Sequence, residues 1–496
     1  MKTIVLGPPG TGKTDTLLKE VDKYLKTSDP NKIGYFSFTQ KAANEGRDRA
    51  MDKFNLTEDD LPYFRTLHSL AFRRLGLKKE NVMQNKHYED LGKKINMRID
   101  YNEYDEEQTG IFTTNSEYLR IIQLAQLRGI TTEQQYNLKE HSQDLSVRDL
   151  KILDGELKAY KKQYGLIDYS DMILDFIKSD ASPKFDVVFI DEAQDLSRMQ
   201  WDMAKTIWNK TEDSYVAGDD DQAIFRWAGA DVDSFITQTG KFLNLTQSYR
   251  VPRIVHDFAM GIVKRISKRL HKEWAPRNKS GLLSYYHEFQ DVDMSSGKWF
   301  VLARTRHMLN ELENVLYSKG LYYQNKFKKG YEKDLYEAVI DWEEWRKNKD
   351  LNADQIKRIA SYMSPNHYQK ESLQYLSKDK SYNMEEAYNN QGLKTKLVWY
   401  EAFDSAPLKQ IKYIRKMRAN GEQLNKPPRI LLSTIHGVKG GECSNVVLLT
   451  DLSRNTQKSM DRFPDEENRL FYVGATRTKD HLHIIRPKDI YKSFRL

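Results

Sequence analysis

Short runs of apolar and β-branched residues recur in the first half of the chain, and helical patterns of apolar residues separate them. Apolar runs of this length are typical of buried strands. They lie at residues 3–6, 33–38, 185–190, 215–217 and 242–245. Strands that alternate with helices form parallel sheets that are covered by helices on both faces. The first half of the chain therefore predicts an α/β domain.

A second set of strand candidates follows in the second half of the chain. They lie at residues 299–302, 430–432, 446–449 and 481–485. At 496 residues the chain is also too long for a single hydrophobic core. We therefore expect two α/β domains, each built on a parallel sheet.

Strand-like runs are missing from two long segments, in which polar and helix-forming residues dominate. In the first segment, apolar residues with the spacing of one helix face are Tyr118, Ile121, Ile122 and Ala125. In the second, such faces consist of Leu335, Ala338, Val339 and Trp342, and of Leu408, Ile411 and Ile414. We expect each domain to carry a helical insertion. The expected ranges are 1–76 and 151–244 for the first domain, 77–150 for its insertion, 245–328 and 429–496 for the second domain, and 329–428 for its insertion.

Composition narrows the class of protein. The net charge of +8 and the pI of about 9.0 fit a polyanionic partner. The single cysteine, Cys443, excludes an intramolecular disulfide and a cysteine-cluster metal site, which fits a reducing compartment. No apolar run approaches the roughly 18 residues of a membrane span, and the first strand candidate leaves no room for a signal peptide. We expect no membrane partner and a cytoplasmic location.

The most specific local pattern is a glycine-rich stretch between the first strand candidate and a helical pattern. It fits the phosphate-binding pattern G-x-x-x-x-G-K-[ST] with the residues Gly7, Pro8, Pro9, Gly10, Thr11, Gly12, Lys13 and Thr14. Backbone N–H groups and a helix N-terminus make such a loop an anion site. Lys13 is expected to reach the β- and γ-phosphates, and the Thr14 hydroxyl to ligate Mg²⁺. A glycine loop that merely turns is the alternative, and the Lys-Thr pair directly after a strand argues against it.

Polar residues follow two later strand candidates, at the strand ends where ligands collect in α/β folds. Asp191 is expected to hold the Mg²⁺ shell, and Glu192 to take a proton from the attacking water. Gln222 follows three aspartates, and its amide suits contact with the γ-phosphate or its water. Seen alone, these residues also fit a solvated acidic turn and a loop glutamine.

Arg250 and Arg477 are candidate arginine fingers, which stabilise the charge on the γ-phosphate oxygens during phosphoryl transfer. Chemistry alone does not single them out among 79 lysines and arginines. Each lies in a distinctive string of residues.

Several such strings resemble, in order, the motifs of a superfamily 1 DNA helicase of the UvrD/Rep/PcrA type, in superfamily 1A. They lie at residues 7–14, 38–43, 66–69, 168–171, 191–195, 218–230, 245–250, 301–323, 433–442 and 466–477. Their common order makes a chance match negligible. The resemblance covers both α/β domains, whereas the insertions match only in position and helical character.

The resemblance implies two RecA-like P-loop domains with inserted subdomains, with ATP and Mg²⁺ in the cleft between the domains. It implies that ATP hydrolysis drives 3′-to-5′ movement along single-stranded DNA. The residues that it assigns to the roles given above are Lys13, Thr14, Asp191, Glu192, Gln222, Arg250 and Arg477. It also implies that Gln194 couples the nucleotide state to DNA, that Tyr249 stacks on the base and that Glu442 meets the ribose hydroxyls.

The positions that match DNA contacts in this family are Phe38, Thr39, His68, Phe225, Trp227 and His436. Aromatic faces suit this role because they can stack on any base. Without the surrounding motifs, core burial would be favoured for Phe225 and Trp227, and a structural role for His436. The implied partners are single-stranded DNA, junctions of single and double strands, and repair or replication proteins, in a bacterial or virus-infected bacterial cell.

Some features depart from the family pattern. Only six residues precede Gly7, so we expect no upstream glutamine segment to read adenine, and hydrolysis of other triphosphates is plausible. Gly437 and Gly441 stand where the family often has Ser and Leu. Three alternatives stay open: a translocase that does not unwind, a nucleotide-gated DNA-binding switch, and, for the phosphate loop alone, a small-molecule kinase. The pathway and the oligomeric state stay open as well.

Overall fold

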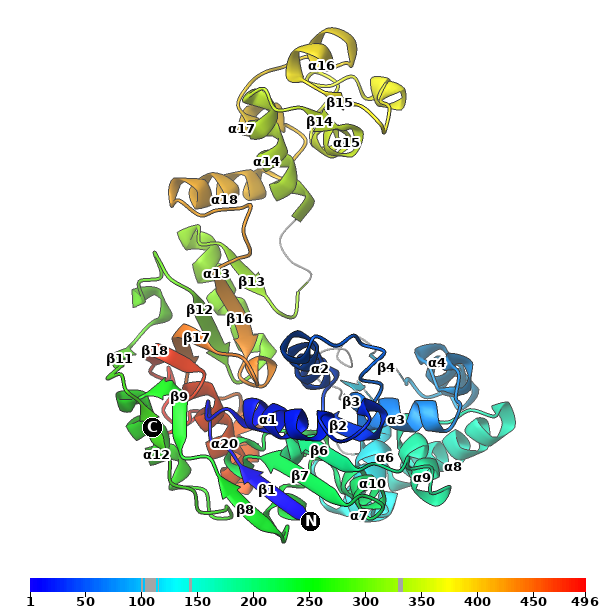
Figure 1. Cartoon of the computed structure of the whole chain (residues 1–496). Helices are drawn as coiled ribbons and strands as arrows, with labels where there is room; N and C mark the ends of the chain where they lie inside the picture. Colours follow the sequence, from blue (N-terminus) through cyan, green and yellow to red (C-terminus); the bar gives the residue numbers. More distant parts are fainter. Residues whose placement is uncertain (100, 103–112, 115, 142–144, 329–332) are drawn as a thin grey trace.

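The structure, a computed structural model, describes residues 1–99, 101–102, 113–114, 116–141, 145–328 and 333–496. Two large parallel sheets form the centres of two domains, and two groups of helices extend from them (Figure 1). Within these ranges, no helix combines the length and the apolar character needed to cross a membrane.

The first sheet has six parallel strands in the order β3-β2-β6-β7-β1-β8. These strands are β1 (Lys2–Leu6), β2 (Ile33–Ser37), β3 (Phe64–Thr66), β6 (Val187–Asp191), β7 (Asp213–Gly218) and β8 (Lys241–Asn244). The covering helices are α1 (Lys13–Leu25), α2 (Gln40–Phe54), α3 (Leu67–Arg74), α9 (Tyr169–Lys178) and α10 (Arg198–Trp208). Val187 and Phe189 belong to the apolar cluster that contains residues of α1 and α2. Val188 and Ile190 belong to the cluster that contains residues of α3, α9 and α10. Burial on both faces explains the continuous apolar run of this central strand.

The second sheet also has six parallel strands, in the order β11-β18-β17-β12-β16-β13. These strands are β11 (Leu282–Tyr286), β12 (Trp299–Ala303), β13 (Tyr323–Asn325), β16 (Ile430–Thr434), β17 (Cys443–Leu449) and β18 (Thr478–Ile485). The covering helices are α12 (Arg253–Val263), α13 (Leu309–Lys319) and α20 (Pro464–Ala475). Val446 and Leu448 share a cluster with α12 and α20, and Val447 and Leu449 share one with α13. The cluster around α12 and α20 continues into the first domain, so the two domains share a core.

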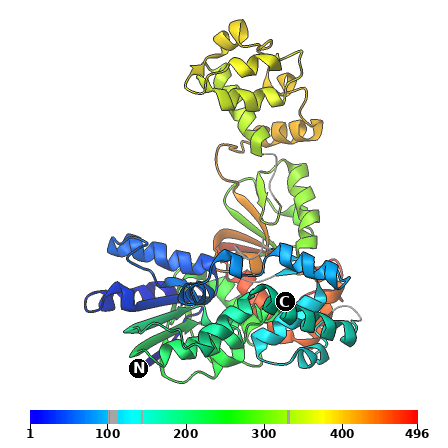
Figure 2. The same cartoon turned by 90° about the vertical axis from the view of Figure 1, so that its right-hand side faces the viewer.

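The first insertion contains α4 (Asn85–Lys94), β4 (Tyr101–Asn102), β5 (Thr113–Thr114), α6 (Glu117–Arg128), α7 (Thr132–Asn137) and α8 (Val147–Tyr164). The second contains α14 (Lys333–Arg346), β14 (Leu351–Asn352), α15 (Ala353–Ser361), β15 (Ser381–Tyr382), α16 (Met384–Asn390), α17 (Trp399–Ala402) and α18 (Leu408–Ala419). A separate apolar cluster around Trp342, Trp345 and Phe403 stabilises the second insertion. Figures 1 and 2 show that this insertion stands away from the rest of the molecule.

The predicted fold class, two α/β domains with parallel sheets and helical insertions, is confirmed. Within the two large sheets, the strands β3, β11 and β13 were not predicted; nor were the strands of the smaller two-stranded sheets. β3 and β13 have only three residues each, too few to show a period. β11 is an edge strand with Leu282 and Tyr285 exposed, so it lacks a continuous apolar run.

The domain boundaries stay predictions. The expected boundary after residue 150 falls inside α8, and Leu150, Leu153 and Leu157 all pack in the core of the first insertion. The expected start of the second insertion, residue 329, lies outside the described residues.

Candidate nucleotide site and nucleic-acid interface

The glycine-rich loop makes a tight turn between β1 and α1. The φ angles of Gly10 and Gly12 are 72° and 80°, in the left-handed region that glycine adopts without strain. The Thr11 hydroxyl donates to the Pro8 carbonyl at 2.8 Å, which closes the loop. Helix α1 begins directly after it, at Lys13, so the helix N-terminus faces the loop.

Two glycines of the loop leave room for other groups. A Cβ atom on Gly7 would lie 2.0 Å from Cγ of Lys13, and one on Gly10 would lie 2.4 Å from Cβ of Arg250. The Tyr249 N–H donates to the Gly10 carbonyl at 2.9 Å. The loop therefore holds its own lysine on one side and the segment after β8 on the other.

Asp191, at the end of β6, lies next to the start of α1. Its Oδ2 accepts hydrogen bonds from the Thr14 hydroxyl at 3.0 Å and from the Tyr35 hydroxyl at 2.8 Å. Burial, together with the neighbouring Glu192, raises the pKa of Asp191. Mg²⁺ prefers oxygen ligands. The hydroxyl and carboxylate oxygens of Thr14 and Asp191 therefore fit the predicted metal position.

Glu192 has a φ of 52°, which is uncommon for a residue other than glycine. Its Oε2 accepts from Nε2 of Gln194 at 2.6 Å, and its Oε1 lies 3.8 Å from Nζ of Lys13. Burial by itself would raise the pKa of Glu192, but the positive charges of Lys13 and Lys439 outweigh it and lower this pKa to about 2. Glu192 is therefore ionised at neutral pH.

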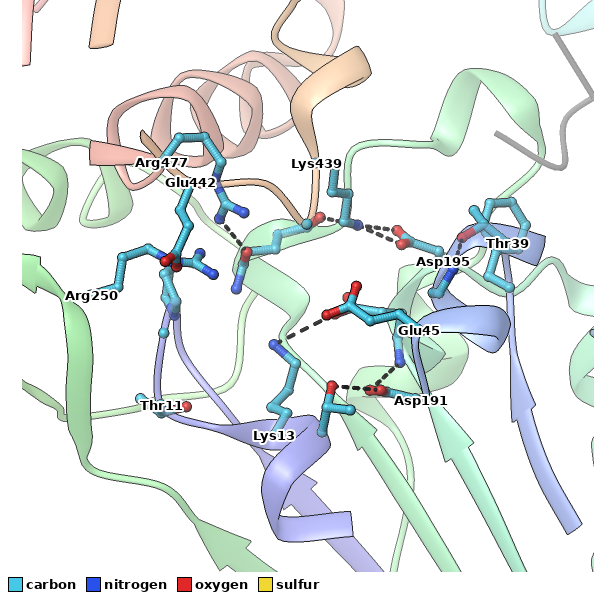
Figure 3. Close-up of a pocket in the computed structure, with 18 of the residues that line it drawn as sticks. Thr11, Lys13, Thr39, Glu45, Asp191, Asp195, Arg250, Lys439, Glu442 and Arg477 are labelled. Carbon is cyan, nitrogen blue, oxygen red and sulfur yellow. Dashed lines mark hydrogen bonds and ion pairs between the residues drawn. The ribbon is translucent and has the colours of Figure 1, made fainter. Parts of the chain in front are cut away.

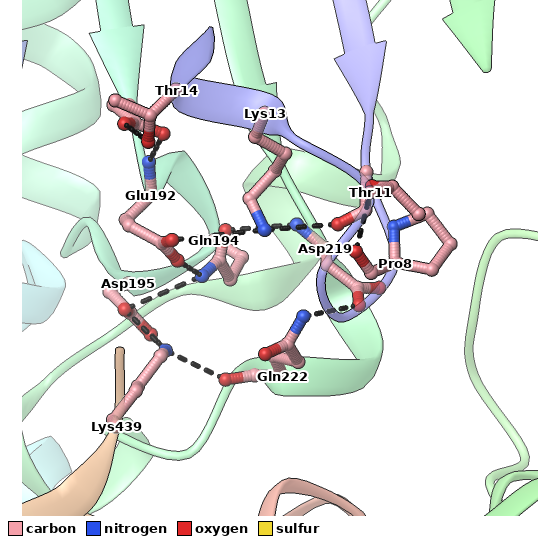
Figure 4. Close-up of polar contacts among 12 residues, drawn as sticks. Pro8, Thr11, Lys13, Thr14, Glu192, Gln194, Asp195, Asp219, Gln222 and Lys439 are labelled. Atoms are coloured by element: carbon pink, nitrogen blue, oxygen red, sulfur yellow. Dashed lines mark hydrogen bonds and ion pairs between the residues drawn. The ribbon is translucent and has the colours of Figure 1, made fainter. Parts of the chain in front are cut away.

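Gln222 lies at the centre of a hydrogen-bond network that joins the two domains (Figure 4). Its Nε2 donates to Oδ2 of Asp219 at 2.8 Å, and its Oε1 accepts from Nη2 of Arg477 at 2.8 Å. Its backbone carbonyl accepts from Nζ of Lys439 at 2.7 Å. Oε1 of Gln194 accepts from the Asp219 N–H at 3.0 Å. The amide of Gln222 is therefore fixed on both sides, by one residue of each domain.

The second domain supplies the predicted arginine fingers. Burial is the main cause that lowers the pKa of Arg477 to about 9, so its guanidinium is still charged at neutral pH. Nε of Arg250 donates to Oε2 of Glu442 at 2.7 Å, and Nζ of Lys479 donates to Oε1 at 2.8 Å. Burial would raise the pKa of Glu442, but these two cations lower it to about 2. Tyr249 is 73% exposed, so its ring face is open to a ligand.

These residues surround a cavity of about 420 Å³ between the two domains (Figure 3). The predicted residues that line it are Pro8, Pro9, Gly10, Thr11, Gly12, Lys13, Thr14, Asp191, Glu192, Gln222, Tyr249, Arg250, Glu442 and Arg477. Phe38, Thr39, Phe225 and His436 line it as well. Gly7 precedes this lining at the end of β1, and Gln194 is buried behind Glu192.

Lys439 was not predicted as a site residue. Its Nζ donates to Oδ1 of Asp195 at 2.7 Å and also contacts Oδ2, so it joins the second domain to the segment after β6. Burial raises the pKa of Asp195 to about 7. Lys439 lies in the motif-like string 433–442, which was the available signal. Tyr35, the donor to Asp191, carries no such signal, because it lies inside an apolar strand.

Four of the residues predicted to contact DNA form one aromatic cluster. The ring of Phe225 lies 5.7 Å from Phe38, 6.4 Å from Trp227 and 6.1 Å from His436, between centroids. Phe225 is only 3% exposed, whereas Trp227 is 40% exposed. Burial lowers the pKa of His436 well below its usual value, so its ring is neutral. Trp227 therefore presents the accessible ring, and Phe225 supports it from inside.

His68 and Thr39 lie at the edge of this cluster. His68, Phe38 and Trp227 line a small hollow of about 60 Å³ together with residues of α6. Burial lowers the pKa of His68 to about 4. Oγ1 of Thr39 accepts from the Ala42 N–H at 3.1 Å and so caps α2. The structure thus gives Thr39 a role in the fold, and its DNA contact stays a prediction.

Comparison with known proteins identifies the family. The model of the UvrD/REP helicase N-terminal domain matches residues 1–243, and the model of the UvrD-like helicase C-terminal domain matches residues 429–485. The chain belongs to the UvrD-like helicase family. The resemblance seen in the sequence motifs is thereby confirmed.

Curated members of the UvrD-like family are similar to the chain at low identity. The ATP-dependent DNA helicase PcrA of Bacillus subtilis (strain 168) is 26% identical over 389 residues, which cover 73% of this chain and 50% of that protein. The probable DNA helicase II homolog of Mycoplasma capricolum is 22% identical over 393 residues, which cover 68% of this chain and 49% of that protein. The chain spans about half the length of the curated relatives it matches.

Proposed function

We propose that this chain is an ATP-dependent motor that moves along single-stranded DNA and separates duplex strands, as a helicase. The observation that carries the proposal is the convergence of both domains on one cavity. Arg477 and Lys439 of the second domain bond directly to Gln222, which follows a strand of the first domain. A change at the phosphates can therefore change how the two domains contact each other.

Each side chain at the cavity suits a step of hydrolysis. The loop N–H groups and Lys13 bind the phosphates, and Thr14 and Asp191 are suited to hold Mg²⁺, which would neutralise phosphate charge when bound. Glu192 is ionised at neutral pH and can orient and deprotonate a water molecule. The guanidinium of Arg477 can stabilise negative charge on the γ-phosphate oxygens.

The aromatic cluster connects the cavity to the proposed DNA path. Phe225 and His436 line the nucleotide cavity and also contact Trp227, whose ring is accessible. Base stacking on such a ring requires no particular sequence. A shift of the second domain moves His436 relative to Trp227, which supports coupling between hydrolysis and grip on a strand.

The first test is the steady-state rate of ATP hydrolysis with and without single-stranded DNA, for the native chain and for Lys13→Ala. We expect strong stimulation by DNA, and loss of hydrolysis in Lys13→Ala with retained folding by circular dichroism. Turnover of the native chain that does not respond to DNA would refute the motor and favour a nucleotide-gated switch.

The second test separates a helicase from a translocase that does not unwind. Partial duplexes with a 3′ or a 5′ single-stranded tail are incubated with the protein, ATP and Mg²⁺. We expect strand separation only from the 3′ tail. Removal of streptavidin from a biotinylated single strand without strand separation would identify a translocase instead.

The family relation supports a role in DNA repair or replication in a bacterial cytoplasm, acting on single strands and on their junctions with duplex. The relatives described above are a DNA helicase of Bacillus subtilis and a probable DNA helicase of Mycoplasma capricolum. Whether other triphosphates replace ATP is tested by measuring hydrolysis of GTP, CTP and UTP under the same conditions.

A further inference from the structure

Three successive aspartates are buried directly before Gln222. Asp219, Asp220 and Asp221 follow β7, and all three side chains are almost completely shielded from water. Buried carboxylates of like charge are unfavourable unless cations neutralise them. The residues that supply those cations therefore also help to fix the position of Gln222.

The cations come from the second domain, from the segment of residues 264–274 between α12 and β10 (Ala275–Arg277). The Lys272 amine contacts all three carboxylates: Asp220, Asp221 at 3.0 Å and Asp219 at 3.2 Å. Arg269 binds Asp221 with two parallel hydrogen bonds of 2.7 Å each. Together, two cations face three carboxylates, so removal of Lys272 would leave one cation against three buried negative charges.

The segment that carries these cations is itself anchored to the second domain. The Ser267 N–H donates to Asp465, at the start of α20, at 2.9 Å. Arg469 of α20 donates to the carbonyl groups of Asp220 at 2.8 Å and of Lys268 at 2.6 Å. The cluster is therefore a fixed joint between the end of β7 and α20.

Asp219 transmits this arrangement to the site. Its Oδ1 contacts Lys272, and its Oδ2 accepts from Nε2 of Gln222. Its backbone N–H donates to Gln194. If the Asp219 carboxylate turns away, Gln222 loses the acceptor that orients its amide towards Arg477.

We propose that Lys272 is a positioning residue for hydrolysis: it neutralises the buried aspartates and thereby holds the Gln222 amide in line with Arg477. The inference rests on the proposed ATP hydrolysis. Lys272 lines neither the nucleotide cavity nor the aromatic cluster, so its loss affects the rate of the chemical step and leaves nucleotide binding unchanged.

The test compares Lys272→Met, Lys272→Arg and the double variant Lys272→Met/Asp220→Asn in DNA-stimulated ATP hydrolysis. Methionine keeps the length of the side chain without the charge, arginine keeps the charge, and Asp220→Asn removes one negative charge without touching Gln222. For Lys272→Met we expect kcat to fall about tenfold or more while KM for ATP stays within about threefold. We expect Lys272→Arg to retain most of the native kcat. The kcat of the double variant should be at least about threefold higher than that of Lys272→Met.

Lys268→Met is the matched control, because Lys268 lies on the same segment and its side-chain amine pairs with Asp233 at the surface, at 2.7 Å, while its backbone contacts are kept in the variant. Its kcat should equal that of the native chain. An unchanged kcat in Lys272→Met, or an equal loss in the double variant, overturns the inference. If Lys272→Met does not fold, the inference is tested with Lys272→Arg and the double variant instead. A double variant that folds but does not hydrolyse ATP would then overturn the inference. Lack of turnover in the native chain would instead refute the proposed function.

Discussion

Lys439→Met tests the contact of Lys439, in the second domain, with first-domain residues that line the nucleotide cavity. The amine of Lys439 contacts both carboxylate oxygens of Asp195 and the backbone carbonyl of Gln222. Both partners belong to the first domain and are buried. Methionine fills a similar volume but leaves the carboxylate and the carbonyl without their shared donor.

The size of the effect follows from burial and protonation. Removal of one partner from a buried ion pair costs about 3–5 kcal/mol. The pKa of Asp195 is about 7, so this carboxyl can take a proton near neutral pH at little cost. The loss therefore lies near the lower limit, about 3 kcal/mol, which is roughly a 100-fold change in an equilibrium constant. The ion pair of Lys439 with Asp195 joins the two domains. Its loss therefore destabilises the domain arrangement that brings Glu192, Gln222 and Arg477 together.

The assay is kcat/KM for ATP at pH 7.5 with saturating single-stranded DNA. We expect a decrease of about 100-fold for Lys439→Met and less than about tenfold for Lys439→Arg, which keeps the charge. Lys412→Met, on the exposed face of α18, is the matched control and should not change the rate. A folded Lys439→Met protein with kcat/KM within about threefold of the native value would refute the argument.

Three further predictions concern other parts of the site. Gly10→Ala should abolish nucleotide binding, measured by fluorescence of a labelled nucleotide, because the new Cβ would lie 2.4 Å from Cβ of Arg250 at a φ of 72°; unchanged binding would contradict the loop geometry. Trp227→Ala should weaken the binding of single-stranded DNA by about 1–3 kcal/mol for each lost stacking contact, equally for different sequences, as measured by fluorescence anisotropy. An unchanged affinity would mean that the strand does not contact Trp227. The hydrolysis rate should fall as the pH drops through about 7, because the buried carboxyl of Asp195 then takes a proton and its ion pair with Lys439 weakens. Asp195→Asn should remove that inflection, and a native inflection that persists in this variant would assign it to another group.

The structure also shows where local pattern stops being informative. The continuous apolar runs of the central strands and the spacing of helix faces predicted both sheets, because burial on both faces requires those residues. The three-residue strands β3 and β13 left no such pattern, and their hydrogen bonds come from neighbouring strands. Phe225 shows that local sequence is equally uninformative within the site. A phenylalanine two positions before a tryptophan gives the same sequence pattern whether it packs beneath the tryptophan ring or stacks on a base.

The sequence by itself determined the phosphate loop, the order of the motifs and the two parallel-sheet domains, because each depends on residues within one strand, loop or helix. Only the tertiary structure decided that Lys439 reaches Asp195, that Lys272 neutralises the aspartates before Gln222, and that Arg250 pairs with Glu442. These partners are separated by 244, 51 and 192 positions along the chain. Among 79 lysines and arginines, the packing of the second domain against the first brings Lys439 and Lys272 onto buried carboxylates of the first domain.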